Sequence, residues 1–262
     1  MIVDSHNHLG RRRTDDDETP FAGVELDDFL AIMDRDGIDH AVIFPLFDRY
    51  GDYNPANETV RRAFMAQPGR FTGLFRVDPY LEHQTLDDVE NALARDGFRG
   101  LKIHPRSDRT YIDDFERIDP LVEIAQGHDW PVLIHTGDDP PCRPYMLFDL
   151  LKRHSHATFI MGHCGQRAYQ EGLWVAGHCP NVYMETSTIA HPQIIQLIIE
   201  TVGPERVLFG TDVPFGDPRV ELFKYEILEL DPRIRDMIMA ENAVRLWHLD
   251  LPWQEPNDQA QN

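Results

Sequence analysis

Four histidines and one aspartate stand at the ends of apolar runs in this sequence, and their side chains suit the binding of a metal ion. These residues are His6, His8, His135, His163 and Asp212. Side chains two residues apart on a strand point to the same face, so His6 and His8 are expected on one face of their strand. Imidazoles joined by one carboxylate suit zinc or a neighbouring divalent transition metal. A lone histidine at a strand end is more often structural, but five such groups at strand ends predict a metal site.

The elements that must carry these residues alternate between short apolar runs and amphipathic segments. The predicted strands are Met1–His8, His40–Leu46, Phe71–Asp78, Gly100–Pro105, Pro131–His135, Thr158–His163, Asn181–Thr186 and Arg206–Asp212. The predicted helices are Leu26–Asp36, Asn57–Gln67, Thr85–Asp96, Asp119–His128, Tyr145–His154, Pro192–Val202, Pro218–Leu230 and a closing Pro232–Leu246. The sixth connection, Gln166–Cys179, has no clear helical pattern.

Strand-and-helix units of about 30 residues, repeated along the chain, favour an α/β fold of the (β/α)8 TIM-barrel type in a single domain. No Gly-x-Gly-x-x-Gly follows a predicted strand, which disfavours a dinucleotide-binding fold. Catalytic groups of such barrels lie at the C-terminal ends of the strands, where the five metal-binding candidates fall. Residues 1–251 are therefore predicted to form the barrel domain, and residues 252–262 a polar C-terminal tail.

The composition narrows the classes of partner. The 262 residues include 25 basic and 45 acidic side chains, a formal net charge of −20, which would repel nucleic acid and anionic membranes. No apolar stretch approaches the roughly 20 residues that cross a bilayer. Three cysteines without a Cys-x-x-Cys spacing disfavour a disulfide scaffold, and no secretory leader is evident at the N-terminus. We expect a cytoplasmic protein with a small-molecule ligand, and a homo-oligomer is left open.

Longer motifs around the same residues resemble those of a known family. The segments are Val3-Asp4-Ser5-His6-Asn7-His8, Leu133-Ile134-His135-Thr136-Gly137, Met161-Gly162-His163-Cys164-Gly165, Phe209-Gly210-Thr211-Asp212-Val213-Pro214 and, in the closing helix, Ala240-Glu241-Asn242-Ala243-Val244-Arg245-Leu246-Trp247. They are similar to the metal motifs of the amidohydrolase superfamily and closest to its amidohydrolase-related branch. That branch includes aminocarboxymuconate-semialdehyde decarboxylase, resorcylate-type decarboxylases and pyrone-dicarboxylate lactonase. The resemblance spans nearly the whole chain.

The resemblance implies roles for the matching residues. One divalent metal, zinc by expectation and manganese as the alternative, would be held by His6, His8, His135 and Asp212. The catalytic residues would be His163, which orients or deprotonates water or polarises the substrate, and Asp212, which shuttles a proton. An open zinc site lowers the pKa of its water to about 7, which gives hydroxide at neutral pH.

The fourth predicted strand leaves the metal count open. Lys102 and His104 share a face of Gly100-Leu101-Lys102-Ile103-His104-Pro105. In binuclear members of the superfamily a carboxylated lysine on this strand bridges two metals, whereas many mononuclear relatives carry a similar Lys-x-His-Pro without that role. We expect one metal, with both side chains near the substrate. Glu185, which ends the seventh predicted strand, either supports the site from behind or is a satisfied polar residue of the barrel.

Arginines near the predicted rim indicate the charge of the substrate. Guanidinium groups bind carboxylates through two parallel hydrogen bonds, and Arg76 and Arg106 are the candidates for that contact. The sequence therefore predicts a metal-dependent hydrolase that opens a lactone or an amide of a small carboxylated molecule. The alternative within the same site is a non-oxidative decarboxylase of an aromatic or muconate-type acid. A TatD-like nuclease and an idle binding protein on the same fold are disfavoured, the first by the acidic charge and by Lys102-Ile103-His104, the second because all five site positions are filled.

Overall fold

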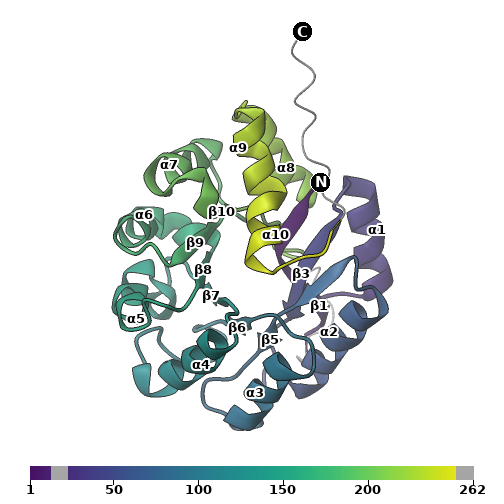
Figure 1. The fold of residues 1–262 in the computed structure, drawn as a ribbon, viewed down its shortest axis with the longest axis vertical. Coiled ribbons are helices and arrows are strands. Elements are labelled where there is room, and N and C mark those ends of the chain that lie inside the picture. The colour runs from purple at the N-terminus through teal and green to yellow at the C-terminus, as the bar shows by residue number, and fades with distance from the viewer. Residues whose placement is uncertain (13–22, 252–262) are drawn as a thin grey trace.

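The computed structural model describes residues 1–12 and 23–251 and arranges them as a ring of strands surrounded by helices (Figure 1). Its strands are β1 (Val3–Arg11), β2 (Gly23–Val24), β3 (His40–Pro45), β4 (Phe71–Gly73), β5 (Phe75–Arg76), β6 (Leu101–Ile103), β7 (Val132–His135), β8 (Phe159–Gly162), β9 (Val182–Glu185) and β10 (Val207–Leu208). Its α-helices are α1 (Leu26–Asp36), α2 (Asn54–Ala66), α3 (Leu86–Ala94), α4 (Phe115–Gly127), α5 (Leu147–Arg153), α6 (Tyr169–His178), α7 (Pro192–Val202), α8 (Pro218–Ile227), α9 (Pro232–Asp236) and α10 (Asn242–Leu246). Shorter turns are the 3-10 helices η1 (Pro140–Cys142), η2 (Pro144–Met146), η3 (His163–Ala168) and η4 (Pro204–Arg206), and the π-helical η5 (Met237–Glu241).

The strands pair in chain order. One sheet has the order β2-β1-β3-β4 and the other β10-β9-β8-β7-β6-β5, and every pair is parallel except the short antiparallel pair β1–β2. β4 and β5 are consecutive pieces of one predicted strand, interrupted at Leu74. The segment after β10 bonds to β1 through Ser5 N to Phe209 O (2.9 Å) and Asp212 N to His6 O (2.8 Å). These bonds bring the two sheets together as the (β/α)8 barrel predicted from the sequence.

Alternate residues along the strands pack inside and outside the barrel. On β7, Leu133 belongs to the inner apolar cluster, while Val132 and Ile134 pack outward against the helices. β8 repeats the pattern, with Ile160 inside and its neighbours outside. This period of two is the normal alternation of a strand, so the polar residues that end each strand on the inner face must point into the barrel mouth.

A β-bulge in β1 adjusts this alternation for the first two histidines. Val3 packs in the inner cluster, and in a regular strand His6 and His8, which follow it by an odd number of residues, would point outward, yet both face the site. The register with β3 shifts between Asp4 and Asn7, so one extra residue of β1 is accommodated there. An inserted residue reverses which face the following side chains take, and it thereby turns both histidines inward.

The helices bury one apolar face against the outside of the ring. In α7 this face is Ile195, Ile198, Ile199 and Val202, the spacing expected of an amphipathic helix. At the opposite end from the site, α10 lies across the ring (Figure 1), and Trp247 is buried against the inner cluster. The barrel is therefore plugged at one end and open at the other.

The structure corrects several predicted boundaries. The eighth predicted strand, Arg206–Asp212, is a strand only over β10, because its last residues bond to β1 across the seam instead of continuing the ladder to β9. The unpatterned connection Gln166–Cys179 contains η3 and α6, whose Gly172 and Gly177 dilute the apolar pattern. The closing helix is divided into α9, η5 and α10. The tail predicted over residues 252–262 lies outside the described residues.

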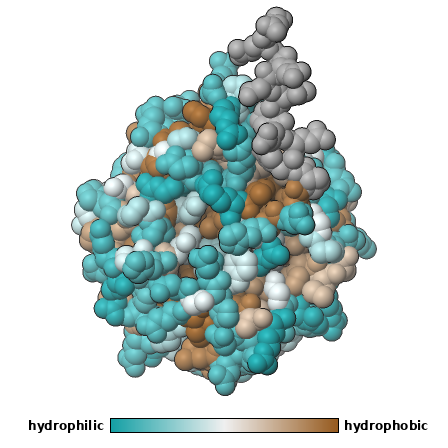
Figure 2. Space-filling view, viewed as in Figure 1, coloured by the Kyte–Doolittle hydropathy of each residue, from teal (hydrophilic) through white to brown (hydrophobic). Residues whose placement is uncertain are grey.

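Hydrophilic residues cover most of the face seen in Figure 2, and apolar residues form scattered groups between them. Across residues 1–12 and 23–251, no helix has both the length and the apolar character needed to cross a membrane.

Candidate metal centre

Asp212 and the two histidines of β1 converge at the open end of the barrel. Oδ1 of Asp212 lies 3.3 Å from Nε2 of His8 and 3.6 Å from Nε2 of His6. The same Oδ1 is buried and accepts no hydrogen bond from the residues that the structure describes. Burial raises the pKa of Asp212 to about 6. A buried carboxylate oxygen without a donor is costly unless a cation or a proton lies beside it.

The opposite sides of the two imidazole rings fix their orientation. Nδ1 of His8 lies 3.2 Å from the carbonyl oxygen of Pro45, which accepts only, so this nitrogen carries the proton. Nδ1 of His6 lies 2.6 Å from Oε2 of Glu185. Both rings therefore present the unprotonated Nε2 to Asp212, and burial holds the pKa of each well below its usual value. Two imidazole lone pairs and a carboxylate oxygen fit a divalent cation.

Lys102 lies beside this group but deeper in the barrel. Its Nζ is 3.2 Å from Nε2 of His6 and 4.4 Å from the ring centre of Phe44. The side chain is fully buried and is not part of the cavity wall. Burial, followed by the charge of Arg76, lowers the pKa of Lys102 to about 7. The structure thus brings Lys102 to the predicted metal ligands rather than to the space that a substrate would occupy.

The two remaining predicted histidines are arranged in a way that the sequence does not specify. Ligand atoms of His6, His163 and Asp212 lie within 4.8 Å of one another, and a second such group contains His104, His135 and Cys142. His135 stacks on His104, with ring centres 3.8 Å apart and planes at 9°, and its ring centre is 4.8 Å from that of His163. His163 is thus nearer to the other ligands than the predicted roles imply, and the assignment of His135 as a ligand stays a prediction.

A cavity of about 660 Å³ opens above these residues. Its floor includes His8, His104, His135, His163 and Asp212. Three arginines from the loops, Arg12, Arg106 and Arg109, line its mouth, and Phe47 and Phe215 add aromatic wall. The guanidinium of Arg12 lies over the ring of Phe215, 5.0 Å from its centre. The cavity therefore combines positive charge with aromatic surface.

The two predicted substrate arginines differ in what they contact. Arg106 is exposed at the rim and pairs with Asp139 at 2.6 Å. Arg76 reaches the cavity wall from a fully buried position, where it donates to Asp108 (3.1 Å) and to the carbonyl oxygen of Pro45 (3.2 Å). Its Nε has no hydrogen-bond partner among the described residues. Arg76 thus brings a buried positive charge to the cavity, and Asp108 neutralises part of it.

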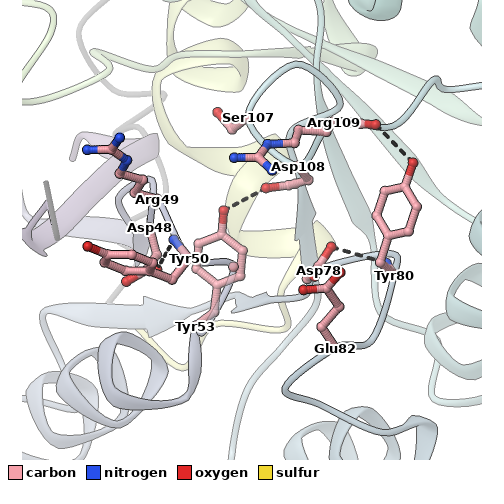
Figure 3. Close-up of a pocket in the computed structure, with 11 residues that line it drawn as sticks. Asp48, Arg49, Tyr50, Tyr53, Asp78, Tyr80, Glu82, Ser107, Asp108 and Arg109 are labelled. Carbon is pink, nitrogen blue, oxygen red and sulfur yellow. Dashed lines mark hydrogen bonds between the residues drawn. The ribbon is translucent and has the colours of Figure 1, made fainter.

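A second cavity of about 510 Å³ adjoins the first and shares Ser107 and Arg109 with it (Figure 3). Tyr53 donates to Asp108 (2.6 Å) at its inner end, and the same carboxylate receives the hydrogen bond from Arg76. Figure 3 shows Asp78 and Glu82 between Tyr53 and Tyr80, with Glu82 the lower of the two. The Tyr53–Asp108–Arg76 contacts therefore form part of the wall between the two cavities.

Several residues that support the site were not identified from the sequence. Asp4 accepts from the backbone and the hydroxyl of Thr211 (3.0 and 2.5 Å), and this holds the segment that carries Asp212. Ser187 lies 2.8 Å from Nδ1 of His163. These contacts join residues 207 and 24 positions apart, so no local pattern reveals them. The only sequence signal for Asp4 and Thr211 is their place in the Asp-Ser-His and Gly-Thr-Asp motifs, beside the predicted ligands.

The fold and the cluster at its open end define the class of this protein: a (β/α)8-barrel enzyme with its polar site at the C-terminal ends of the strands. Residues 3–249 match the model of the amidohydrolase family, and the chain belongs to that family. A search of curated proteins found no match.

Solved structures with the same fold include two decarboxylases and a hydrolase. The 5-carboxyvanillate decarboxylase of Novosphingobium aromaticivorans, with manganese and a nitrobenzoic acid, is 16% identical, with 95% of this chain and 96% of that chain covered and a TM-score of 0.78. The dihydroxybenzoic acid decarboxylase of a Polaromonas species, with manganese and 2-nitroresorcinol, is 21% identical (94% and 96% covered, TM-score 0.72). A probable 2-pyrone-4,6-dicarboxylic acid hydrolase of Acinetobacter baumannii, with citric acid, is 15% identical (95% and 99%, TM-score 0.74). At these identities the likeness establishes the shared fold.

Proposed function

We propose that this protein is a metal-dependent decarboxylase of a small aromatic carboxylic acid. The observation that carries the proposal is the buried, donor-free Oδ1 of Asp212 between two imidazoles, on the floor of a cavity with arginines and aromatic walls. Two of the three neighbours described above are decarboxylases of aromatic acids. Hydrolysis of a lactone or an amide is the second candidate, favoured by the pyrone-dicarboxylate hydrolase neighbour.

One divalent cation would be held by His6, His8 and Asp212, completed by His135 or His163. When bound, it would supply positive charge that stabilises negative charge on the substrate oxygens. The ligand set suits manganese as well as zinc, and the two decarboxylase neighbours contain manganese. We propose a single ion, because Lys102 approaches Nε2 of His6 through its amine (3.2 Å) and so places a positively charged group beside the ligands.

The cavity itself suggests how the substrate is bound. Arg106, at the rim, would pair with a carboxylate by two parallel hydrogen bonds, and Arg76 would add attraction from the wall. Phe47 and Phe215 offer apolar faces to a ring. His104, which lines the cavity beside His135, would contact the ring edge. A small anionic aromatic molecule fits this combination of charge and surface.

Decarboxylation breaks the bond between the ring carbon and the carboxylate carbon, and the ring carbon must then gain a proton. Asp212 and His163 are the titratable groups on the cavity floor that can deliver it. In hydrolysis the same two groups would instead take a proton from water.

An isotope experiment separates the two candidate reactions. Purified protein, supplied with manganese or zinc, is incubated with ortho-hydroxylated benzoates and with pyrone dicarboxylates in D2O and in H2¹⁸O. A decarboxylase releases CO2 and places one deuterium on the ring, whereas a hydrolase places one ¹⁸O in the product carboxylate. Mass spectrometry of the products reads both labels.

The control variants are His6→Ala, which should abolish turnover and metal retention together, and Ser155→Ala, an exposed residue of the loop after α5, which should change neither. Incorporation of ¹⁸O without CO2 would establish the hydrolase instead. Turnover by a metal-free preparation would refute the metal-dependent reaction.

A further inference from the structure

The carboxylate of Glu185, at the end of β9, receives hydrogen bonds from both sides of the site. Oε2 accepts from Nδ1 of His6 (2.6 Å), from the backbone N–H of His163 (3.1 Å) and from the hydroxyl of Ser187 (3.0 Å). Oε1 accepts from the backbone N–H of Ser187 (2.6 Å). The side chain is completely buried. Four donors on one buried carboxylate leave it no role as a donor, so Glu185 is an anchor for its neighbours.

Gly210 leaves the space that this carboxylate occupies. A methyl group on residue 210 would lie 2.8 Å from Cδ of Glu185, still closer to Oε1, and 3.1 Å from Cβ of His6. Gly210 does not adopt a left-handed conformation, so its absence of a side chain serves packing rather than backbone geometry. The glycine of the Phe-Gly-Thr-Asp motif thus allows Glu185 to approach His6.

The hydrogen-bond pattern determines where the protons lie. Because the Ser187 hydroxyl has one hydrogen and donates it to Glu185, its oxygen must accept from Nδ1 of His163, 2.8 Å away. Nδ1 of His163 is therefore protonated and Nε2 is not. His6 is fixed in the same tautomer, since its Nδ1 donates directly to Glu185. One carboxylate thus orients two imidazoles, the first directly and the second through a serine.

We propose that Ser187 and Glu185 are positioning residues that hold His163 with an unprotonated Nε2 for its role in the reaction. Ser187 is buried and is not part of the cavity wall, so it acts on the substrate only through the side chains that it contacts, His163 and Glu185. The inference rests on the proposed function for its catalytic consequence, whereas the tautomer itself is independent of the reaction. Supporting partners of this kind typically contribute about 10–100-fold to activity or metal affinity.

The test measures the tautomer directly. Protein labelled with ¹⁵N in its histidines is examined at neutral pH by long-range ¹H–¹⁵N correlation, which shows which ring nitrogen carries the proton, and the His163 resonances are assigned by their loss in His163→Gln. In the unaltered protein Nδ1 of His163 should be protonated. A proton on Nε2 would overturn the proposal without any variant, and it would do so even if the reaction proved to be hydrolysis.

Variants then connect the tautomer to catalysis. Ser187→Ala should shift His163 towards a mixture of tautomers and lower kcat about 10–100-fold with little change in KM. Ser187→Thr keeps the hydroxyl and should restore the tautomer and most of kcat, while the exposed Ser155→Ala should match the unaltered protein. A loss of kcat in Ser187→Ala with the His163 tautomer unchanged would refute the positioning role.

Discussion

Replacing Gly210 by alanine tests the packing at the centre of the site. The added methyl would lie 2.8 Å from Cδ of Glu185, more than half an ångström closer than ordinary van der Waals contact. Because Glu185 is completely buried and accepts four hydrogen bonds, it cannot move without weakening them. Overpacking costs about 1–3 kcal/mol. A hydrogen bond to a charged group contributes about 1.5–3 kcal/mol.

The expected loss in the free energy of unfolding for Gly210→Ala is therefore about 3–5 kcal/mol, which corresponds to a fall in Tm of roughly 10 °C. Denaturant and thermal unfolding measure it. Gly177→Ala is the matched control, because residue 177 is in α6 and its added methyl would only make an ordinary contact with Thr201 at 3.8 Å. Alanine in a helix is favoured over glycine by about 0.5–1 kcal/mol, so this control should be stable or slightly stabilised.

A double-mutant cycle identifies the cause of the loss. If the methyl acts by displacing Glu185, then Gly210→Ala should cost about 1–3 kcal/mol less in a Glu185→Ala background than in the unaltered protein. Equal costs in both backgrounds, or a Gly210→Ala protein as stable as the original, would refute the reasoning about this contact.

Three further predictions concern proton transfer, metal count and pH. His163→Asn should lower kcat by about 10²–10⁴-fold while elemental analysis still finds one ion; loss of the ion would make His163 a ligand. Lys102→Ala should also retain one ion, and a fall from two ions to one or none would establish a bridging Lys102. Glu221 is a buried residue of α8. Burial raises its pKa from 4.5 to about 7, so its contribution to stability is present below pH 4.5 and lost as the pH rises through 7. The free energy of unfolding of Glu221→Gln, relative to that of the original protein, should therefore increase as the pH rises from 4.5 to 7, as measured by denaturant unfolding. The same pH dependence in both proteins would contradict this prediction.

The strand ends were predictable because a buried parallel strand leaves a strong local pattern. The apolar runs Val132–Ile134, Phe159–Gly162 and Val207–Gly210 are each followed closely by a histidine or an aspartate, and the barrel brings those ends together on one rim. His6, His8, His163 and Asp212 are accordingly close in the structure. The motifs were also sufficient to predict the amidohydrolase family, which the match over residues 3–249 confirms.

The sequence predicts hydrolysis with decarboxylation as the alternative, and the function proposed above reverses that order. The same ligand types serve both reactions, so the motifs alone do not distinguish them. The preference comes from the structural neighbours, two of them decarboxylases of aromatic acids, and from a cavity whose walls combine arginine with phenylalanine.

The sequence by itself determined the order of the elements, the fold and the residue types at the rim, because each depends on periodicity and composition within a short segment. The tertiary structure decided which groups meet. The bulge in β1 turns His6 and His8 inward, the stacking on His104 holds His135 beside Cys142, and Gly210 admits Glu185 to the back of His6. Such contacts join residues from different strands, and their geometry depends on register and close packing, which no single segment of the chain contains.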